Sequence, residues 1–495
     1  MNPKYKLRKL RLSCKKIHLV VLIFLIAGSG CKKFVQINPP TSEIAAATVF
    51  SNNTTASAAM TGIYVNMMLN GYNGMSDGYG SIGFLQGLAA DELTDYDLVD
   101  APFPQFYTNS LTSSSGGGSN YYYWTELYNE LYQVNSAIAG VDGSGSVTAG
   151  IKQQILGEAE FMRAFLHFYA VNLYGPVPIV TTTNYLANDV ISRSPVPKVY
   201  EQIIGDLTDA QAKLSKNFVD AAGVTTSQRT RPNSGAATAL LARVYLYTGK
   251  WDSAEAAATT LINNTSLYGL DTLNGVFLSN SNEAIWQLQP SVTYFNTYDA
   301  TLFVLTSAPG SSQFPASLSN NLLNVFEPGD KRDSDWVGIY TPDSINFYHY
   351  PYKYKVSDYY NPSLPVTEYL MVLRLAEQYL IRAEAEAQLG NIGGAQSDLN
   401  IIRARAGLGP TTANDPTSLL TAILHERQVE LFTEWGHRWF DLIRSTGSVN
   451  INAVMGSPGN VCQQKGGTWN TDWELLPLPL LEIQVNPNLK QNPGY

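Results

Sequence analysis

Two segments of the sequence follow one helix–glycine–helix pattern, and this pattern restricts the fold more than any other feature of the chain. In the first segment, a helical face of small and branched side chains ends before Gly249, which predicts a left-handed helix end. Asp252 and Glu255 have the spacing of a capping box and predict the start of a second helix. The residues expected to face inward are Ala237, Leu241, Val244, Ala254, Ala258 and Leu261. Two antiparallel helices joined in this way form a tetratricopeptide-like hairpin.

The second segment lies far along the chain. Gly390 precedes Ala395 by five residues, as Gly249 precedes Ala254. Apolar residues recur before it at steps of three and four, at Leu373, Ala376, Leu380, Ala383 and Ala387. Gly390 lies 141 residues after Gly249, whereas a tandem array of such hairpins repeats about every 34 residues. A large inserted region therefore separates the two hairpins.

The inserted region, residues 291–365, differs in kind from its surroundings. It contains few helical periods and many Pro, Asn, Ser and aromatic residues. Within it Tyr348, Tyr350, Tyr352 and Tyr354 alternate with period two, which predicts a short strand with one aromatic face. Outside it, helices are expected over 41–69, 122–139, 153–174, 195–216 and 417–443.

The expected fold is mostly α, with a scaffold of tetratricopeptide-like hairpins and a loop-rich insertion that contains short β-strands. The expected divisions of the chain are a signal segment at 1–30, an N-terminal region of helices and loops at 31–230, a tetratricopeptide-like and C-terminal region at 231–290 and 366–495, and the insertion at 291–365.

The N-terminus has the pattern of a secretory signal. Seven Lys and Arg residues precede the apolar run Leu19 to Ala27, and Gly28-Ser29-Gly30-Cys31 follows. The run is shorter than the roughly 20 residues that a spanning helix needs. A bacterial lipoprotein signal ends in small residues and Cys, so Cys31 is expected to become the lipidated first residue of the mature chain. The alternative is an ordinary signal with a Cys beside its cleavage site.

Removal of the signal changes the charge of the protein. The signal holds seven of the 32 basic residues and no acidic residue, so the mature chain carries 25 basic against 41 acidic residues, a net charge of −16. So negative a field repels polyanions, and nucleic acid is excluded as a partner. If Cys31 is acylated, Cys462 remains as the one free thiol, and a structural or incidental role is expected for it.

Several longer motifs resemble those of the SusD/RagB lipoproteins. They are Cys31, the segment 237–252 (ATALLARVYLYTGKWD), the segment 375–385 (LAEQYLIRAEA), the segment 426–444 (ERQVELFTEWGHRWFDLIR) and the terminal stretches from Leu478-Pro479 to Gln491-Asn-Pro-Gly-Tyr495. The resemblance runs in order along nearly the whole mature chain. It implies an outer-membrane lipoprotein that faces outward and is built on tetratricopeptide-like helix pairs. It also implies capture of glycan, or of peptide in some members, above a SusC-like TonB-dependent transporter.

Sugar binding requires flat aromatic rings for stacking and amide, carboxylate or guanidinium groups for hydrogen bonds. The 30 Tyr of the chain against 18 Phe favour such a surface. The candidate ligand-binding residues lie in two loop regions: Tyr72, Tyr79, Tyr96, Tyr107 and Asn109 in the first half, and Tyr294, Asn296, Tyr298, Trp336 and Tyr340 in the insertion. Asn73 and Asp77 are further candidate partners. The alternative for each ring is that it packs a loop onto the helices.

Other charged groups are expected to be structural. Glu430, Glu434 and His437 are predicted to share one helix, where salt-bridged scaffolding that includes Arg427 and Arg444 is favoured over acid–base catalysis. The acidic cluster Asp91, Glu92, Asp95, Asp97 and Asp100 lacks the EF-hand order and is interpreted as a solvated loop rather than a calcium site. No metal or cofactor is expected.

The sequence thus predicts a noncatalytic lipoprotein that captures oligosaccharide and delivers it to a partner barrel, which is expected to contact its helical side. A surface glycoside hydrolase is a second hypothesis and requires two carboxylates in one aromatic cleft. They would lie about 5–5.5 Å apart in a retaining enzyme or about 6.5–9.5 Å apart in an inverting enzyme. A ligand-free assembly factor of the outer membrane is a third, and it requires the loop aromatics to be buried.

Overall fold

The computed structural model describes residues 46–69, 74–97, 102–113, 119–310, 313–357, 365–445 and 457–495. The predicted signal segment, Cys31, Tyr72 and Asn73 lie outside these residues. Residues from Val49 to Tyr495 form one compact unit. Within the described ranges, no helix is long and apolar enough to cross a membrane.

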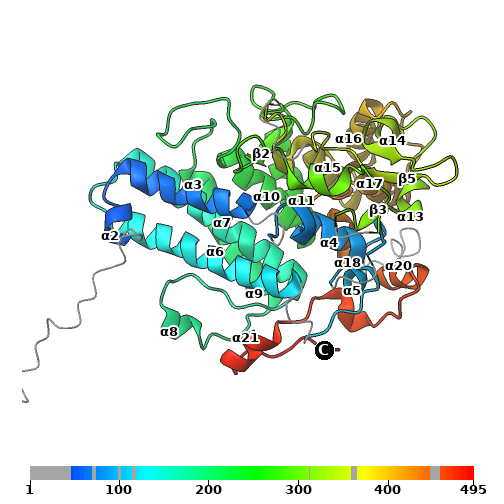
Figure 1. Cartoon of the computed structure of the whole chain (residues 1–495). Coiled ribbons are helices and arrows are strands. Elements are labelled where there is room, and N and C mark those ends of the chain that lie inside the picture. The colour runs from blue at the N-terminus through cyan, green and yellow to red at the C-terminus, as the bar shows by residue number, and fades with distance from the viewer. Residues whose placement is uncertain are drawn as a thin grey trace, which may run out of the picture. The chain divides into compact units, whose positions relative to one another are not determined.

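The first half of this unit is built around one long buried helix, α7 (Ala149–Tyr174). Helix α6 (Ser119–Asp142), helix α9 (Val196–Lys213) and helix α3 (Asn53–Leu69) pack against it (Figure 1). Nearly every residue of α7 after Gly157 is buried, because helices cover it on several sides. Gly175, with φ +71°, ends α7 as the sequence predicts. A short helix, α2 (Ala46–Val49), precedes α3.

Both predicted hairpins are present and stack on each other. The first consists of α10 (Ser234–Tyr247) and α11 (Trp251–Ile262), and the second of α15 (Leu375–Gln388) and α16 (Ile392–Arg405). Helix α11 packs against α15, which brings the two hairpins together across the insertion. The predicted inward faces are buried, although Leu373 lies in an extended segment before α15 rather than on the helix. Gly249 and Gly390 have φ of +67° and +80°. These angles suit glycine because it has no Cβ.

Two local predictions in this scaffold are wrong. Helix α11 begins at Trp251 with Lys250 as its N-cap, so Asp252 lies within the first turn and forms no capping box with Glu255. Asp252 still suits this place, since a negative side chain is favourable near the positive end of a helix dipole.

The helix predicted over 417–443 is in fact two helices, α17 (Pro416–Leu431) and α18 (His437–Arg444). The chain between them takes left-handed angles at Thr433 (φ +56°), Trp435 (φ +47°) and Gly436 (φ +73°). The Trp435 indole donates to the Met371 carbonyl oxygen at 2.8 Å. Tertiary contacts of this segment therefore override a continuous helical pattern.

In the described part of the chain, six short strands pair in three separate antiparallel ladders: β1 (Leu93–Asp95) with β3 (Ala316–Leu318), β2 (Ala284–Leu288) with β6 (Leu370–Arg374), and β4 (Val337–Tyr340) with β5 (Tyr348–Pro351). Strand β2 precedes the insertion and β6 follows it, so their pairing closes the insertion onto the scaffold. Trp286 of β2 packs edge-on against Phe161 and Phe165 of α7. The predicted aromatic strand is confirmed in its first half as β5, which holds Tyr348 and Tyr350, whereas Tyr352 and Tyr354 lie beyond its end.

The remaining elements are short and lie in the loops, the insertion and the C-terminal region. They are η1 (Gly78–Gly80), α4 (Ile82–Ala89), α5 (Phe103–Tyr107), α8 (Tyr185–Asn188), α12 (Tyr298–Phe303), α13 (Asn320–Leu323), α14 (Lys331–Asp335), α20 (Pro458–Gln464), η2 (Thr471–Glu474) and α21 (Leu480–Val485). A mostly helical fold with short strands in the insertion is thus confirmed. The predicted division boundaries remain a prediction.

Candidate aromatic binding surface

The two loop regions that carry the candidate residues meet in space. The Tyr96 amide, just after β1, donates to the Pro315 carbonyl oxygen at 2.7 Å, and the Tyr79 hydroxyl donates to the Gln313 carbonyl oxygen at 2.6 Å. Pairing of β1 with β3 places Asp95 opposite Ala316. Loops separated by more than 200 residues therefore share one ladder.

A buried pair of carboxyl groups joins the same regions a second time. Asp77 accepts hydrogen bonds from the backbone amides of Tyr298 (2.8 Å) and Asp299 (2.7 Å), and Asp299 accepts one from the Gly78 amide (3.0 Å). Burial raises the pKa of Asp77 to about 6, and burial together with the neighbouring Asp77 charge raises the pKa of Asp299 further. The pair therefore retains a proton that isolated carboxyls would release, because two adjacent buried carboxylates cannot both ionise cheaply.

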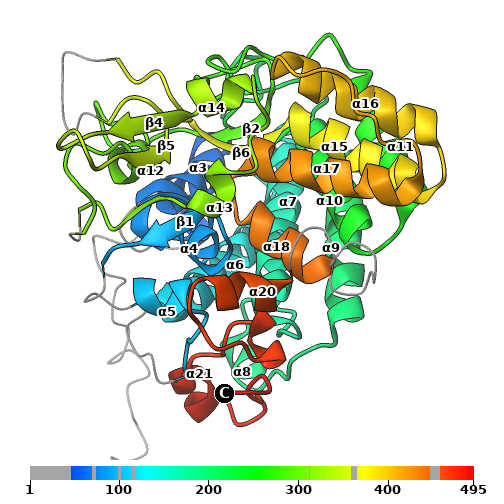
Figure 2. The ribbon, with the colours of Figure 1, turned by 90° about the vertical axis from the view of Figure 1, so that its right-hand side faces the viewer.

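The hairpin of β4 and β5 lies beside this junction (Figure 2). Tyr340 pairs with Tyr348 across the hairpin, and Gly338 pairs with Tyr350, so these side chains share one face. A Cβ on Gly338 would lie 2.3 Å from the Tyr350 ring, so only glycine lets that ring lie over the strand. The Tyr96 ring meets the Tyr348 ring edge to face, with centroids 5.8 Å apart and an angle of 84°. This contact joins the hairpin to the first loop region.

The predicted tyrosines differ in how far solvent reaches them. Tyr96 is 36% exposed and Tyr294 is 47% exposed. Tyr79, Tyr107, Tyr298 and Tyr340 are half-buried. Tyr79 stacks on Phe103, and Tyr298 lies against Phe295 with ring centroids 4.4 Å apart. All of them remain predicted ligand contacts, but the half-buried rings also pack the loops together.

Three predicted ligand contacts have side chains that are buried and used by the fold. Trp336 is fully buried, and its indole donates to the Leu273 carbonyl oxygen at 2.8 Å. Asn296 accepts hydrogen bonds from the amides of Thr367 and Glu368, and the Asn109 side chain donates to the Ala89 carbonyl oxygen. Asp77, the further candidate partner, is equally buried.

Sequence reasoning passed over Tyr348 and Phe347 as binding residues. Tyr348 is half-buried beside Tyr96, and Phe347 is 58% exposed at the end of the hairpin loop. The period-two alternation that predicted the strand was the available signal, because it placed one tyrosine after another on a single face. We use the name aromatic surface for Tyr96, Tyr340, Phe347, Tyr348 and Tyr350.

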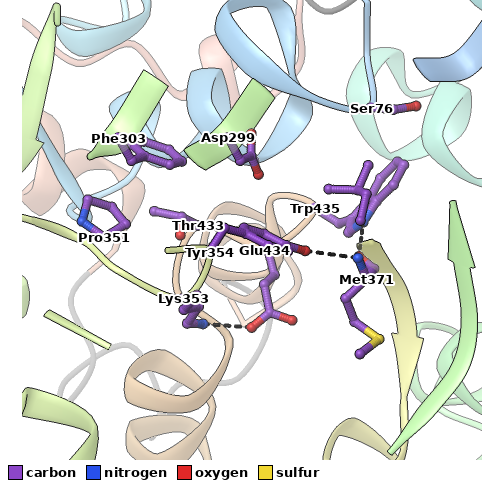
Figure 3. Close-up of a pocket in the computed structure, with 12 residues that line it drawn as sticks. Ser76, Asp299, Phe303, Pro351, Lys353, Tyr354, Met371, Thr433, Glu434 and Trp435 are labelled. Carbon is purple, nitrogen blue, oxygen red and sulfur yellow. Dashed lines mark hydrogen bonds and ion pairs between the residues drawn. The ribbon is translucent and has the colours of Figure 1, made fainter. Parts of the chain in front are cut away.

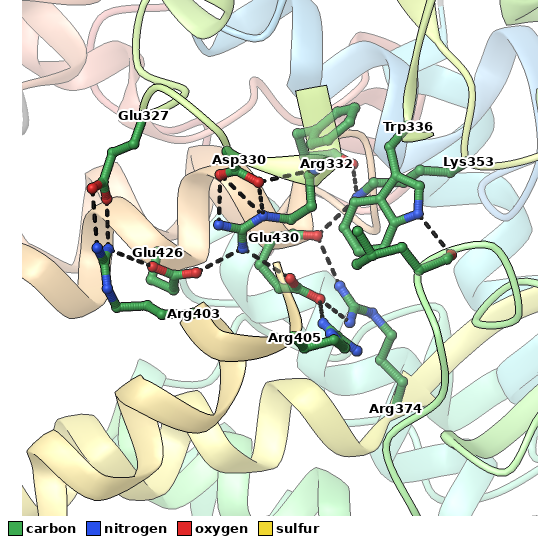
Figure 4. A network of polar contacts seen from close by, with 12 residues as sticks. Glu327, Asp330, Arg332, Trp336, Lys353, Arg374, Arg403, Arg405, Glu426 and Glu430 are labelled. Carbon is green, nitrogen blue, oxygen red and sulfur yellow. Dashed lines mark hydrogen bonds and ion pairs between the residues drawn. The ribbon is translucent and has the colours of Figure 1, made fainter. Parts of the chain in front are cut away.

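The charged helix segment is confirmed as scaffold. Arg374 of β6 contacts Glu430 at 2.6 Å, and Arg405 of α16 contacts the same carboxyl group (Figure 4). Arg374 also contacts Glu283 (2.9 Å) and Glu434 (2.8 Å), and Arg405 also contacts Glu283. Burial opposes ionisation of Glu430, but three neighbouring arginines hold its pKa well below the ordinary value. A carboxylate held in this way is neither a general acid nor a base at neutral pH.

The predicted roles of two further arginines in this scaffold also hold. Arg427 contacts Asp441 at 2.7 Å, and Arg444 contacts Glu384 at 2.5 Å and Asp441 at 2.8 Å. The prediction that Glu430, Glu434 and His437 share one helix is wrong, since the break after α17 separates them. All three side chains are buried.

Comparison with known proteins places these features in one family. A model described as the SusD family matches residues 338–495, and a SusD-like model described as starch-binding and associating with the outer membrane matches residues 65–246. The chain is a member of the SusD family.

Relatives of this SusD-family protein match it along nearly its whole length. Two SusD-like proteins of Formosa agariphila, P25 and P2, are 24% and 26% identical over 97% of this chain and cover 99% and 100% of their own lengths. A SusD superfamily crystal structure from Bacteroides vulgatus has a TM-score of 0.76 at 20% identity, covering 90% of this chain and all of that one. A laminarin binding SusD-like protein has a TM-score of 0.71 at 23% identity, with the same coverage.

The interior of the SusD-family fold also holds a small polar cavity near the loop junction, lined in part by Asp299, Glu434 and Lys353 (Figure 3). Its volume is about 10 Å³, roughly the space that one water needs. The Lys353 ammonium donates to Glu434 at 2.6 Å and to the carbonyl oxygens of Glu430 and Phe432. The cavity is too small for a sugar ring and belongs to the packing of the core.

The acidic cluster at 91–100 is not a solvated loop, and that prediction is wrong. Asp91 accepts two hydrogen bonds of 2.7 Å from Arg438, and Glu92 accepts one of 3.2 Å from the Thr433 amide. Asp95 and Asp97 are buried as well, and Asp100 lies outside the described residues. The segment is buried because it runs from α4 into the β1–β3 ladder.

One group of described residues has the spacing of metal ligands, namely Glu327, His425 and Glu426. Arg403 contacts Glu327 at 2.5 Å and Glu426 at 3.3 Å, and Arg332 contacts Glu426 at 2.7 Å. These guanidinium groups already neutralise the two carboxylates, so the group carries no metal assignment. Cys462 is buried, and burial raises the pKa of its thiol, which agrees with the structural role predicted for it.

Proposed function

We propose that this protein binds oligosaccharide at the aromatic surface and delivers it to a SusC-like TonB-dependent transporter in the outer membrane. The observation that carries the proposal is the meeting of Tyr96 and Tyr348 at the junction of two distant loop regions. These two rings come from separate chain segments and are partly open to solvent. They form a preformed site on which the C–H faces of sugars can stack.

The relatives support carbohydrate as the ligand class. One matching structure is named for laminarin binding, and the starch-binding protein SusD of Bacteroides thetaiotaomicron is 33% identical over 129 residues, a quarter of this chain. The family description also places starch binding at the outer membrane. We infer binding without catalysis, since the carboxylates proposed for acid–base chemistry are held in arginine networks.

The proposed location is the outer face of the outer membrane, with the chain anchored through lipid on Cys31. The seven basic residues, the apolar run and the Gly-Ser-Gly-Cys sequence support this anchor. Mass spectrometry of the protein from its native membrane is expected to find Cys31 as an acylated N-terminal residue. A mature N-terminus elsewhere in the chain would refute the anchor and leave the ligand proposal intact.

Substitution of the two central rings tests the binding proposal. The double variant Tyr96→Ala with Tyr348→Ala is expected to weaken oligosaccharide affinity at least tenfold. Each aromatic ring that stacks on a sugar contributes on the order of 1 kcal/mol to the binding free energy. Binding of maltoheptaose, laminarihexaose, xylohexaose and mannohexaose to the full chain in detergent is measured by isothermal titration calorimetry.

Tyr245→Ala provides the control for loss of a tyrosine ring, since Tyr245 lies on the scaffold helix α10 outside the aromatic surface. This variant is expected to bind as the wild type does. Unchanged affinity in the Tyr96/Tyr348 variant, with binding intact in the wild type, would contradict the aromatic surface as the site. Release of reducing sugar by the pure protein would favour the glycoside hydrolase hypothesis instead.

A further inference from the structure

A concave region with aromatic side chains lies away from the aromatic surface, where α6, α8 and α21 come together. It is a groove of about 430 Å³, within the size range of small-ligand sites. Figure 2 shows α8 and α21 apart from the β4–β5 hairpin that carries the aromatic surface. We use the name α6–α21 groove for this concavity.

The α6 side of the groove is aromatic because three aromatic residues recur at the spacing of the helix. Trp124, Tyr128 and Tyr132 follow one another at steps of four, so they lie along one face of α6. Trp124 is buried with its ring centroid 4.7 Å from that of Tyr128, whereas Tyr132 is 54% exposed. Across the groove, Tyr185 at the start of α8 is 67% exposed.

Polar groups stand among these rings. Asn129 and Asp189 line the groove and are exposed, and Glu482 of α21 lines it half-buried. Burial raises the pKa of the Glu482 carboxyl group, and the neighbouring Trp124 side chain opposes part of that rise. Tyr128 is held in turn, because its hydroxyl donates to the Pro178 carbonyl oxygen at 3.1 Å. The floor of the groove is thus formed by packed rings, while its rim offers amide and carboxylate groups.

The groove lining combines open rings and polar groups with aliphatic side chains, of which Val485 is 74% exposed. Leu186, Leu480 and Leu481 are exposed on α8 and α21 but do not line the groove. Aliphatic side chains are typical of protein contact surfaces, whereas open tyrosine rings beside amides and carboxylates match the C–H faces and hydroxyls of a sugar. The exposed rings of Tyr132 and Tyr185 beside Asn129 and Asp189 thus give the concavity groups that suit a carbohydrate.

We propose that the α6–α21 groove is a second oligosaccharide-binding site, in which Tyr132 and Tyr185 stack on sugar rings and Asn129, Asp189 and Glu482 accept or donate hydrogen bonds at the rim. The inference rests on the proposed function for the ligand class and adds a site to it. Two sites on separate parts of the surface would let one molecule hold a long glycan at two points, which raises avidity without a new contact at either site.

The test counts bound ligands on the full chain in detergent, with the same four oligosaccharides. Native mass spectrometry of the wild type is expected to show two bound molecules of one oligosaccharide. The variant Tyr132→Ala with Tyr185→Ala is expected to keep one, with the affinity for the lost molecule reduced at least tenfold. The Tyr96/Tyr348 variant is expected to lose the molecule at the aromatic surface and keep the one in the α6–α21 groove.

Leu186→Ala is the matched control, since Leu186 is 67% exposed on α8, as Tyr185 is, but lies outside the groove. It is expected to bind two molecules, and far-ultraviolet circular dichroism checks that all variants are folded. A single bound molecule that is lost only in the Tyr96/Tyr348 variant would overturn the second site and leave the proposed function standing. A single molecule lost only in the Tyr132/Tyr185 variant would support the groove and overturn the aromatic surface. Absence of any binding would overturn both.

Discussion

Arg374→Met is expected to lower the free energy of unfolding by about 3–5 kcal/mol. Arg374 is nearly fully buried and lies between Glu283, Glu430 and Glu434, at 2.9, 2.6 and 2.8 Å. Methionine fills much of the volume of the side chain but carries no charge. The three carboxylates would remain buried without the positive charge of Arg374, and these uncompensated charges are the main source of the lost stability.

Urea unfolding followed by tryptophan fluorescence measures this effect. Lys198→Met is the control, because Lys198 and Glu201 form an ion pair with both side chains more than 60% exposed. Exposed pairs contribute little, so this variant is expected to change the unfolding free energy by less than about 1 kcal/mol. Equal effects of the two substitutions would show that the network around Arg374 does not hold the fold together.

The same network sets a pH dependence. Burial opposes ionisation of Glu434, but Arg374 and Lys353 hold its pKa below the ordinary value, and the pKa of Glu430 is lowered in the same way. A carboxyl group with a lowered folded-state pKa stabilises the fold above its unfolded pKa and loses that contribution as the pH falls. The wild type is therefore expected to lose stability in acid, and the loss caused by Arg374→Met is expected to be smaller there than at pH 8.

Glu92→Gln is expected to stabilise the protein at alkaline pH, by on the order of 5 kcal/mol at pH 9. Glu92 is buried, and burial raises its pKa from 4.5 to about 8. The folded state keeps this proton while the unfolded state releases it near pH 4.5, so the fold loses stability as the pH rises through this window. Glutamine cannot ionise, and its amide oxygen can still accept the hydrogen bond from the Thr433 amide.

The measurement compares unfolding free energies of wild type and variant at pH 5 and pH 9. The difference is expected to be small at pH 5, where Glu92 is protonated in the fold, and to grow toward pH 9. Glu201→Gln, at an exposed position, is the control and is expected to show no such growth. A difference that stays constant with pH would mean that Glu92 does not carry the raised pKa assigned to it.

Several features follow from local rules and were therefore predictable. The hairpin faces are set by the helix period, and Gly249 and Gly390 end their helices because a left-handed angle suits a residue without Cβ. The aromatic strand followed from period-two alternation at Tyr348 and Tyr350. Each of these patterns spans few residues, so no distant part of the chain is needed to read it.

The candidate site depended on distant contacts and was predicted only in outline. The sequence pointed to two loop regions, and their meeting at Tyr96 and Tyr348 could not be derived without the pairing of β1 with β3. Trp336 looked like Tyr340 in sequence, yet Trp336 is buried. Burial of one aromatic and exposure of another are decided by which distant residues pack on them.

The sequence alone thus determined the helical scaffold and the aromatic character of the insertion, because hydrophobic period and glycine placement act within a few turns of chain. Tertiary structure alone decided which rings face solvent, where the helix after Leu431 breaks, and which carboxylates are paired with arginines. These outcomes depend on contacts between residues far apart along the chain, and such contacts override local preference when they bury charged or aromatic groups.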